Sequence, residues 1–391
     1  MNAFDDLSID ALRRRGTVKW SFYGDDVLPA WVAEMDFPLA PVLQAALHEA
    51  VERSDTGYPP GPAVSGLPDA CAAWLTRSFG LAVDPRQIGI LPDILRGIEL
   101  AIEVFSRPES PVVVMTPSYP PFFETVRVAG RQVVEAPLAT SGGRFVCDLD
   151  AIDAALHAGA GTVILCNPHN PVGRVFTREE LAALATVVEA HGARVVADEV
   201  HAPLVYPATA HVSYATASDA AVRHSVTLVS ASKGWNVPGL KCAEIVLTNE
   251  ADVEGWERVS FLRTHGASIL GILTNRVAFE QGEPWLRDAV AYLDGNRTLL
   301  AQLLAELLPQ VRYTVPQGTY LAWLDCRALG LDDPAAFFLQ RAKVALNDGA
   351  AFGPPGQGWV RLNFATSRAI LTTIIQRMAA ALKEAGVAPL A

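Results

Sequence analysis

The chain has 391 residues, half of them apolar and 19% charged, and a formal net charge of −11 at pH 7. This length allows about two domains of roughly 100–200 residues each, with ample core. The acidic charge argues against a nucleic-acid partner, and no apolar run reaches the ~18 residues that would predict a membrane span. The N-terminus is acidic and polar, unlike a secretory signal, and the five cysteines form no C-x-x-C pair. We therefore expect free thiols in a cytoplasmic protein, and we expect no metal site because the eight histidines lack ligand spacing.

The first 40 residues contain Pro29 and Pro38 and show no sustained hydrophobic period. This pattern predicts an extended arm that packs on another surface. A helix is expected over 41–53, because Pro41 is well placed at a helix start. The turn-rich loop Thr56–Gly61 follows.

From about residue 66 to 250, short apolar runs alternate with helical periods. Most of the runs are continuous and β-branched, as expected of strands that are buried on both faces. The expected strands are Ile88–Leu91, Pro111–Met115, Gln132–Glu135, Thr162–Cys166, Arg194–Ala197, Val226–Val229 and Ala243–Leu247. Helices are expected between them, for example over 96–106, 178–191 and 253–264. The pattern predicts an open, mainly parallel α/β sheet of seven strands.

The order of expected strands and helices in the C-terminal third predicts a smaller α+β domain. The expected strands are 318–325 and 360–364, the expected helices are 267–282, 285–308, 334–343 and 367–386, and 353–358 is expected to be a flexible loop. We predict an N-terminal arm and part of the small domain over 1–45, a large domain over 46–275 and the rest of the small domain over 276–391.

Ligands of open α/β sheets bind beyond the carboxyl ends of the strands, so the residues after each strand matter most. These positions hold candidate groups of several kinds: Asp93, Ile94, Tyr119, Asn170, Asp198, His201, Ser230, Ser232 and Lys233. Each has an ordinary explanation when taken alone. The ordinary explanation is a helix cap or loop carboxylate for Asp198, a turn residue for Asn170, and a solvated lysine after a strand for Lys233.

Together these residues supply every group that pyridoxal 5′-phosphate requires. Lys233 can form a Schiff base with the aldehyde, and Asp198 can keep the ring nitrogen protonated. Asn170 can donate to the phenolic oxygen, and Tyr119 can cover the ring. The phosphate can be held by hydroxyls, a cation and helix N–H groups, and the residues available for it are Ser230, Ser232, Lys241, Asp93 and Ile94.

The chain resembles the fold-type I pyridoxal-phosphate enzymes of the aminotransferase class I/II superfamily. Within them it resembles the MalY/PatB group of cystathionine β-lyases and C–S lyases, in its actinobacterial branch. The resemblance extends from about Lys19 to Ser367, and it is carried by the stretches 31–37, 167–171, 198–201, 230–233 and 361–364. It implies a three-layer, aminotransferase-like large domain with a smaller second domain.

The resemblance also implies roles for individual residues. Lys233, Asp198 and Tyr119 would be catalytic, and His201 would occupy the place where ordinary aminotransferases have a tyrosine. Arg361 would grip the substrate α-carboxylate, and Tyr58 would reach the phosphate of the neighbouring subunit in a homodimer with shared sites. The remaining substrate-binding positions would be Ala33, through its backbone, and Asn170, Tyr320 and Trp31.

The implied reaction is an α,β-elimination of L-cystathionine and related cysteine S-conjugates that yields a thiol (homocysteine), pyruvate and ammonia. Two alternatives stay open: an aminotransferase, which uses the same residues, and a regulatory binding protein of the same fold. The aromatic residues Tyr119, Phe122, Trp31, Trp235, Tyr320 and Phe364 predict an apolar pocket for thioethers. No second arginine is evident as a clamp for a distal carboxylate, which predicts tolerance for varied S-substituents.

Two positions depart from the family pattern. Lys241 stands where many aminotransferases have an arginine, so the charge is kept but the bidentate geometry is lost. Asp93 places a carboxylate near the expected phosphate turn, and we expect it to cap the following helix with its side chain turned away from the phosphate.

Overall fold

The computed structural model describes residues 4–387 of the chain. Its largest sheet has seven strands in the order β2-β10-β9-β8-β7-β3-β4. The strands are β2 (Ile88–Leu91), β3 (Val112–Thr116), β4 (Val133–Pro137), β7 (Thr162–Cys166), β8 (Arg194–Asp198), β9 (Ser225–Val229) and β10 (Ala243–Leu247). Only β10 runs antiparallel to its neighbours, and the other pairings are parallel. All seven predicted strands and the mainly parallel sheet are confirmed.

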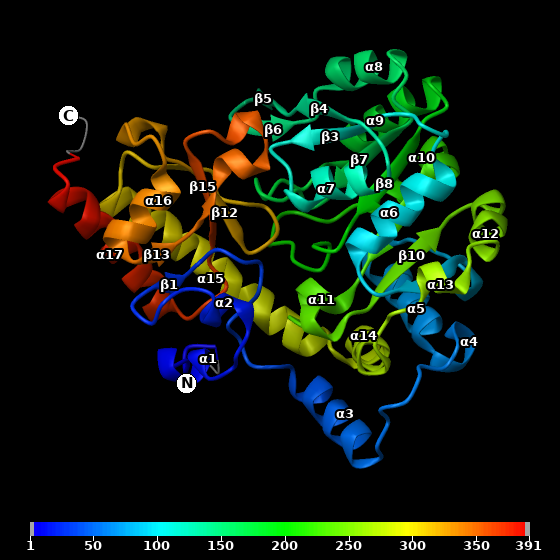
Figure 1. Ribbon diagram of the computed structural model, residues 1–391, viewed down its shortest axis with the longest axis horizontal. Helices are drawn as coiled ribbons and strands as arrows, with labels where there is room; N and C mark the ends of the chain where they lie inside the picture. The colour runs from blue at the N-terminus through cyan, green and yellow to red at the C-terminus, as the bar shows by residue number, and fades with distance from the viewer. Residues whose placement is uncertain (1–3, 388–391) are drawn as a thin grey trace.

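Helices cover both faces of this sheet and form a three-layer arrangement (Figure 1). One face packs against α6 (Ile94–Phe105), α7 (Pro121–Val128) and α12 (Glu250–Glu257). The other packs against α8 (Leu149–His157), α9 (Arg178–Ala190) and α10 (Asp219–His224). Because every residue of β3, β7, β9 and β10 is buried, the continuous apolar runs reflect cover from both sides.

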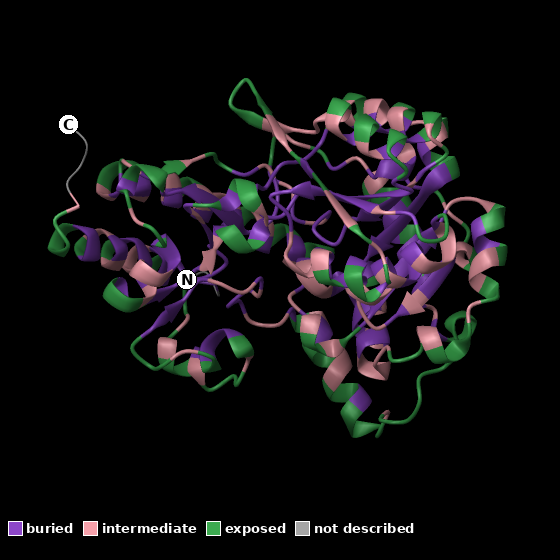
Figure 2. Ribbon diagram, turned by 45° about the horizontal axis from the view of Figure 1, so that its top comes forward, coloured by how far each residue is buried: buried purple, intermediate pink, exposed green. Residues whose placement is uncertain are grey.

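A second, antiparallel sheet has the order β11-β12-β15-β14 and lies on the other side of the molecule (Figure 1). Its strands are β11 (Arg312–Tyr313), β12 (Leu321–Asp325), β14 (Asn347–Asp348) and β15 (Trp359–Asn363). The helices around it include α14 (Ile269–Gln281), α15 (Glu283–Leu307) and α17 (Arg368–Glu384). Burial is continuous through both sheets and the region between them (Figure 2). The predicted α+β character of the C-terminal part is confirmed.

Several expected elements differ from the structure. The N-terminal segment is not a plain extended arm, because it forms α1 (Ile9–Arg13), α2 (Val18–Ser21) and β1 (Leu28–Pro29), and β1 pairs with β13 (Val344–Ala345). The expected helix 253–264 is divided into α12 and α13 (Phe261–Thr264), since the Ser260 hydroxyl accepts from Leu262 N–H and starts a new helix. The expected helix 334–343 consists of α16 (Pro334–Phe337) followed by a π-helical turn.

The expected flexible loop 353–358 contains a 3₁₀ turn over Pro354–Gly356. Its backbone is closely packed, because a Cβ atom at Gly356 would lie 1.9 Å from the carbonyl oxygen of Gly349.

Within residues 4–387 no helix combines the length and apolarity needed to cross a bilayer. In the same range, no group of three His, Cys, Asp or Glu side chains is arranged to hold a metal ion.

A buried ion pair anchors the N-terminal segment. Lys19 Nζ lies 2.9 Å from Asp36 Oδ1, and both side chains are almost completely buried. Lys19 also donates to the carbonyl of Glu34, at 3.0 Å, and the indole N–H of Trp20 donates to Asp36 Oδ1, at 2.7 Å. These contacts fix the backbone of residues 34–36 from within the core.

We expect Lys19→Met to lower the free energy of unfolding by about 3–5 kcal/mol, because it leaves the Asp36 carboxylate buried without its cation. Urea unfolding followed by fluorescence measures the change. The matched control is Lys343→Met, whose exposed pair with Asp26, at 3.3 Å, should contribute no more than about 1 kcal/mol. Equal losses in the two variants would contradict the anchoring role of Lys19.

Candidate active site

A cavity of about 180 Å³ lies at the carboxyl ends of the central strands. Its walls combine residues that follow β2, β3, β7, β8 and β9, as the strand-end rule predicts. The predicted site residues that line it are Ala33, Asp93, Ile94, Tyr119, Asn170, Asp198, His201, Ser230, Ser232, Lys233 and Lys241. The fold therefore brings together most of the residues chosen from the sequence.

Lys233 lies on α11 (Ala231–Gly234), one short turn after the end of β9. The Ser230 hydroxyl accepts from Ser232 N–H, at 3.0 Å, and starts this turn. The Lys233 ammonium donates to the carbonyl of Ala33, at 2.7 Å, and Lys233 lines the cavity. Desolvation and the nearby Arg361 lower the pKa of Lys233 to about 8, against the opposing effect of Asp198 and Glu34. A substantial fraction of the amine is therefore neutral near physiological pH, which favours its reaction with an aldehyde.

Asp198 ends β8 and is buried, and its carboxylate accepts one backbone hydrogen bond from Val200, at 3.0 Å. Burial raises the pKa of Asp198 to about 7, although the Val200 N–H and Lys233 oppose the shift. A carboxyl group in this state lacks a cationic partner in contact with it. A protonated ring nitrogen would supply that partner.

His201 is buried three residues further on, and its Nδ1 atom has no hydrogen-bond partner in the described chain. Burial lowers the pKa of His201 to about 3, and Lys233 and Arg361 add to the effect. The imidazole is therefore neutral and can donate or accept one hydrogen bond at the cavity wall.

Arg361 lies on β15 of the second sheet and does not itself line the cavity, but it contacts Asn170, which does. Its guanidinium donates to the side-chain oxygens of Asn170, at 3.0 Å, and Asn347, at 2.6 Å, and to the carbonyl of Trp31, at 3.0 Å. No carboxylate of residues 4–387 pairs with it, its Nε atom has no partner, and the side chain is buried. Burial lowers the pKa of Arg361 to about 10, so the group remains a cation. A buried cation with neutral partners is a ready binding site for a carboxylate.

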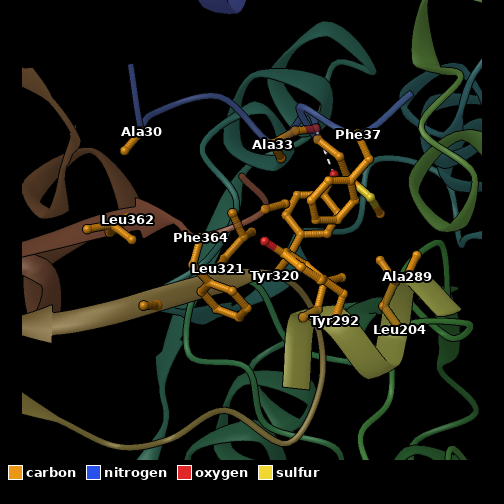
Figure 3. Close-up of a cluster of buried hydrophobic side chains, with 14 of the residues drawn as sticks. Ala30, Ala33, Phe37, Leu204, Ala289, Tyr292, Tyr320, Leu321, Leu362 and Phe364 are labelled. Carbon is orange, nitrogen blue, oxygen red and sulfur yellow. Dashed lines mark hydrogen bonds between the residues drawn. The ribbon is translucent and has the colours of Figure 1, made fainter. Parts of the chain in front are cut away.

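Two of the predicted substrate-binding positions, Ala33 and Trp31, contribute their backbone carbonyls rather than their side chains. The Ala33 carbonyl accepts from both Lys233 and the Tyr320 hydroxyl, the latter at 2.9 Å. Figure 3 shows Ala33 and Tyr320 in the same cluster of buried side chains. Trp31 contributes its carbonyl, which Arg361 binds, while its indole packs against Phe22 and Tyr23.

The expected phosphate end is built around an ion pair. Lys241 Nζ lies 2.7 Å from Asp93 Oδ2, and both side chains are partly exposed. Asp93 also accepts from Arg96 N–H, at 2.9 Å, so it caps α6 as expected. Burial opposes the shift, but the hydrogen bonds from Lys241 and Arg96 lower the pKa of Asp93. Asp93 is therefore charged at neutral pH and competes with a phosphate for Lys241.

Ser230 and Ser232 differ in what their hydroxyls can offer. The Ser230 hydroxyl donates to the carbonyl of Cys242, at 2.7 Å, so its proton is already used within the fold. Ser232 lines the cavity and has the freer hydroxyl. A contact of either hydroxyl with phosphate remains a prediction.

Tyr119 and Tyr58 lie in contrasting places. Tyr119 lines the cavity and packs edge-to-face on Phe122, with ring centroids 5.5 Å apart. Burial raises the pKa of Tyr119, so the phenol keeps its proton at neutral pH. Tyr58 is 100% exposed on the loop between α3 (Pro41–Glu52) and α4 (Pro62–Ser65), at the lower edge of the molecule in Figure 1. The fold of a single chain does not bring Tyr58 to the cavity.

The expected aromatic pocket is wrong. Of the six aromatic residues chosen for it, only Tyr119 lines the cavity. Trp235 is fully buried between Trp74 and Phe279, and its indole N–H donates to Gly282. Phe122, Tyr320 and Phe364 belong to the hydrophobic cores. Nearness in sequence to a site residue does not place an aromatic side chain in the site, because the fold uses these side chains in its hydrophobic cores.

The sequence did not reveal three residues that hold Arg361 or the segment after Ala33 in place. Asn347 binds Arg361 because the two are directly paired across β14 and β15. Phe352 packs under the same guanidinium, 4.9 Å from ring centroid to Cζ. The Asn236 side chain donates to the carbonyl of Met35 and accepts from its N–H, both at 2.8 Å, and so fixes the segment after Ala33. The signals in the sequence were indirect: Asn347 and Phe352 lie in the stretch 346–353, which resembles the actinobacterial branch, and Asn236 lies three residues after Lys233.

Comparisons with known proteins agree with this geometry. Residues 32–378 match the family described as aminotransferase class I and II. A cystathionine beta-lyase of Corynebacterium glutamicum is 40% identical over 96% of this chain and 99% of its own length. The cystathionine beta-lyase PatB of Bacillus subtilis is 33% identical over 94% and 98%. A solved chain of Corynebacterium diphtheriae, provisionally named a PLP-dependent beta-cystathionase, has 41% identity and a TM-score of 0.91 over 96% of this chain and 98% of its own.

The chain belongs to the aminotransferase class I and II family, and its cofactor is pyridoxal 5′-phosphate. The residues present fit that cofactor. The cavity holds an amine with a lowered pKa, a buried acid without a cation and an orphaned imidazole nitrogen.

We expect Asp93→Asn to tighten cofactor binding several-fold, because it frees the Lys241 ammonium for the phosphate. Asparagine caps helices about as well as aspartate, so α6 should be preserved. Fluorescence titration of the apoprotein with pyridoxal 5′-phosphate measures the dissociation constant. Asp84→Asn is the control, since Asp84 caps the turn Pro85–Gln87 and lines neither this cavity nor the larger one that adjoins it at Lys233. Weaker binding by Asp93→Asn would mean that the pair organises the phosphate site.

Proposed function

We propose that the protein is a carbon–sulfur lyase of the cystathionine β-lyase type. It would convert L-cystathionine and water to homocysteine, pyruvate and ammonia, by α,β-elimination followed by hydrolysis of the released aminoacrylate. The observation that carries the proposal is a buried Arg361 without an anion, which donates to Asn170 in the wall of the small cavity that also contains Lys233, an amine with a lowered pKa. The similarity to two cystathionine beta-lyases over nearly the whole chain supports the lyase reaction.

Substrate orientation follows from the charges. The α-carboxylate of an amino acid would bind Arg361, whose Nε has no partner and whose planar fork suits a carboxylate. Asn170 is placed between Arg361 and the cavity, with its oxygen already accepting from Arg361. Its amide N–H groups would therefore point the other way, as donors to the phenolic oxygen of the cofactor.

Proton transfer would rest on Lys233. When bound, pyridoxal 5′-phosphate withdraws electrons from the α-carbon and so acidifies its C–H bond. The neutral Nζ of Lys233 would take the α-proton, after which the Cβ–S bond breaks and the thiolate leaves. The Ala33 carbonyl, which accepts a hydrogen bond from Lys233, would hold the amine on the correct side of the cavity. Asp198 would retain its negative charge beside the ring nitrogen, and its burial makes that charge effective.

An aminotransferase is the second candidate, because it uses the same residues and returns the proton to the cofactor. The matching family covers both reaction types. The two are separated by assaying L-cystathionine without an added keto acid. Release of pyruvate and a free thiol identifies a lyase, whereas a requirement for keto acid identifies a transaminase.

We expect Lys233→Ala to reduce pyruvate release from L-cystathionine by at least about a thousandfold, because it removes both the Schiff-base amine and the proton acceptor. Borohydride reduction of the wild type should attach the cofactor to the peptide that contains Lys233, and mass spectrometry detects it. Full activity in the variant, or attachment to another lysine, would disprove the assignment. Cofactor binding without attachment in the variant would show that the fold is intact.

We further propose a homodimer with shared sites, in which Tyr58 contributes to the site of the partner subunit. The support is the position of Tyr58, which is fully exposed and does not line the cavity of its own chain. The free state of all five cysteines supports a reducing, cytoplasmic location.

Mixed dimers test the shared site. A chain with Lys233→Ala and a chain with Tyr58→Ala are each expected to be poorly active alone. Co-expressed, they should regain up to half of the wild-type activity per mixed dimer, since one site then has both Lys233 and a Tyr58 from the partner. No gain, measured as pyruvate release by tandem-purified mixed dimers, would place Tyr58 outside the partner's site.

A further inference from the structure

A second cavity adjoins the first at Lys233. It measures about 930 Å³, and it shares Ala33, Lys233 and Pro238 with the smaller cavity. An amino acid held by Arg361 with its α-carbon near Lys233 must extend its β-substituent away from the cofactor. We assign the β-substituent to the larger cavity because Lys233 lines both cavities. This argument rests on the proposed function, because it assumes a substrate with a β-substituent.

Glu34 is one of the residues that line this larger cavity. Its backbone is held by Lys19 and by the side chain of Asn363, which donate to the Glu34 carbonyl at 3.0 and 2.7 Å. The side chain is half-buried, and its carboxylate has no ion-pair or hydrogen-bond partner among residues 4–387. The carboxylate acts on the Lys233 amine, whose pKa it raises, but it contacts no cation and is therefore suited to bind one.

Arg15 lines the same cavity. One of its terminal nitrogens donates to the carbonyls of Asp36 and Phe37, at 2.7 and 3.3 Å, and these bonds orient the guanidinium. No carboxylate of the described chain lies within ion-pair distance, Glu34 included. The remaining N–H groups are free to bind an anion.

We propose that Glu34 and Arg15 form a subsite for a zwitterionic distal group on the β-substituent. Glu34 would bind the distal ammonium and Arg15 the distal carboxylate. The ligand class is a cysteine thioether that ends in an α-amino acid, as L-cystathionine does. The subsite replaces the expected apolar pocket, and it supplies the second arginine that the sequence did not reveal.

The test compares four substrates that differ only in the charge of the tail. L-cystathionine carries both charges, S-(2-aminoethyl)-L-cysteine only the ammonium, S-(2-carboxyethyl)-L-cysteine only the carboxylate, and S-propyl-L-cysteine neither. The value of kcat/KM for each is expressed relative to that for S-propyl-L-cysteine in the same holoenzyme. This ratio cancels any general loss of activity.

We expect Glu34→Gln to lower the ratio about tenfold for the two substrates with an ammonium tail, and Arg15→Gln to lower it about tenfold for the two with a carboxylate tail. A tenfold change is the lower end of what a charge-assisted hydrogen bond contributes. The conservative variant Glu34→Asp should recover part of the loss. The control Asp288→Asn removes an exposed carboxylate on α15 that lines neither cavity, and it should leave all ratios unchanged.

An equal loss for all four substrates in Glu34→Gln would overturn the subsite and show that Glu34 acts through Lys233. If wild-type holoenzyme released no pyruvate from any of the four, the lyase proposal would fail, and the subsite would be judged by binding. Calorimetric titration of Lys233→Ala holoenzyme, with and without Glu34→Gln, then compares L-cystathionine with S-propyl-L-cysteine. A selectivity that does not change with Glu34→Gln would overturn the subsite by this route.

Discussion

The backbone of residues 30–36 connects the two sheets and the active site through hydrogen bonds. Its carbonyl at Trp31 accepts from Arg361 of the second sheet, and its carbonyl at Ala33 accepts from Lys233 of α11, which follows β9 of the first sheet. Ala30 is bonded to Ala345 and Asn363, and Asp36 N–H to Ala365. Because the lysine and the arginine bind the same short segment, the distance between amine and carboxylate-binding group is fixed by backbone geometry. The buried pair of Lys19 and Asp36 holds this segment from the other side.

The electrostatics of the cavity follow from incomplete pairing. Arg361 is buried with neutral partners, and Asp198 is buried with one backbone donor. Unpaired buried charges are costly, so the fold must stabilise them elsewhere. The large hydrophobic cores that pack on the two sheets supply this stability. The cost is recovered when a carboxylate and a ring cation enter, which favours the binding of both.

The large sheet could be predicted from the sequence because its strands are continuous β-branched runs, and such runs have few other uses. Lys233, Asp198 and Asn170 followed from the rule that places ligands at strand ends. The partners of Arg361 could not be found in this way, since Asn347 meets it only through the pairing of two short strands far apart in the chain. The aromatic pocket failed for a related reason. Trp235 and Phe364 are near site residues in sequence, but the side chains of neighbouring residues on a strand or turn point in different directions.

In the segment 30–36, the backbone carbonyls hold the groups that carry out the reaction, whereas a side chain sets the specificity. Arg361 and Lys233 use its carbonyls, which any side chain at those positions would provide, whereas Glu34 lines the larger cavity. Glu34 can therefore be exchanged without altering the groups that hold the amine and the arginine. Ala33 is more constrained, because its carbonyl accepts two donors and its side chain is buried between them. A fold arranged in this way can keep one proton-transfer geometry while the outer wall sets which β-substituents are accepted. Differences in substrate range among chains of this fold should then arise at side chains such as Glu34 and Arg15, while the backbone hydrogen bonds of the segment stay the same.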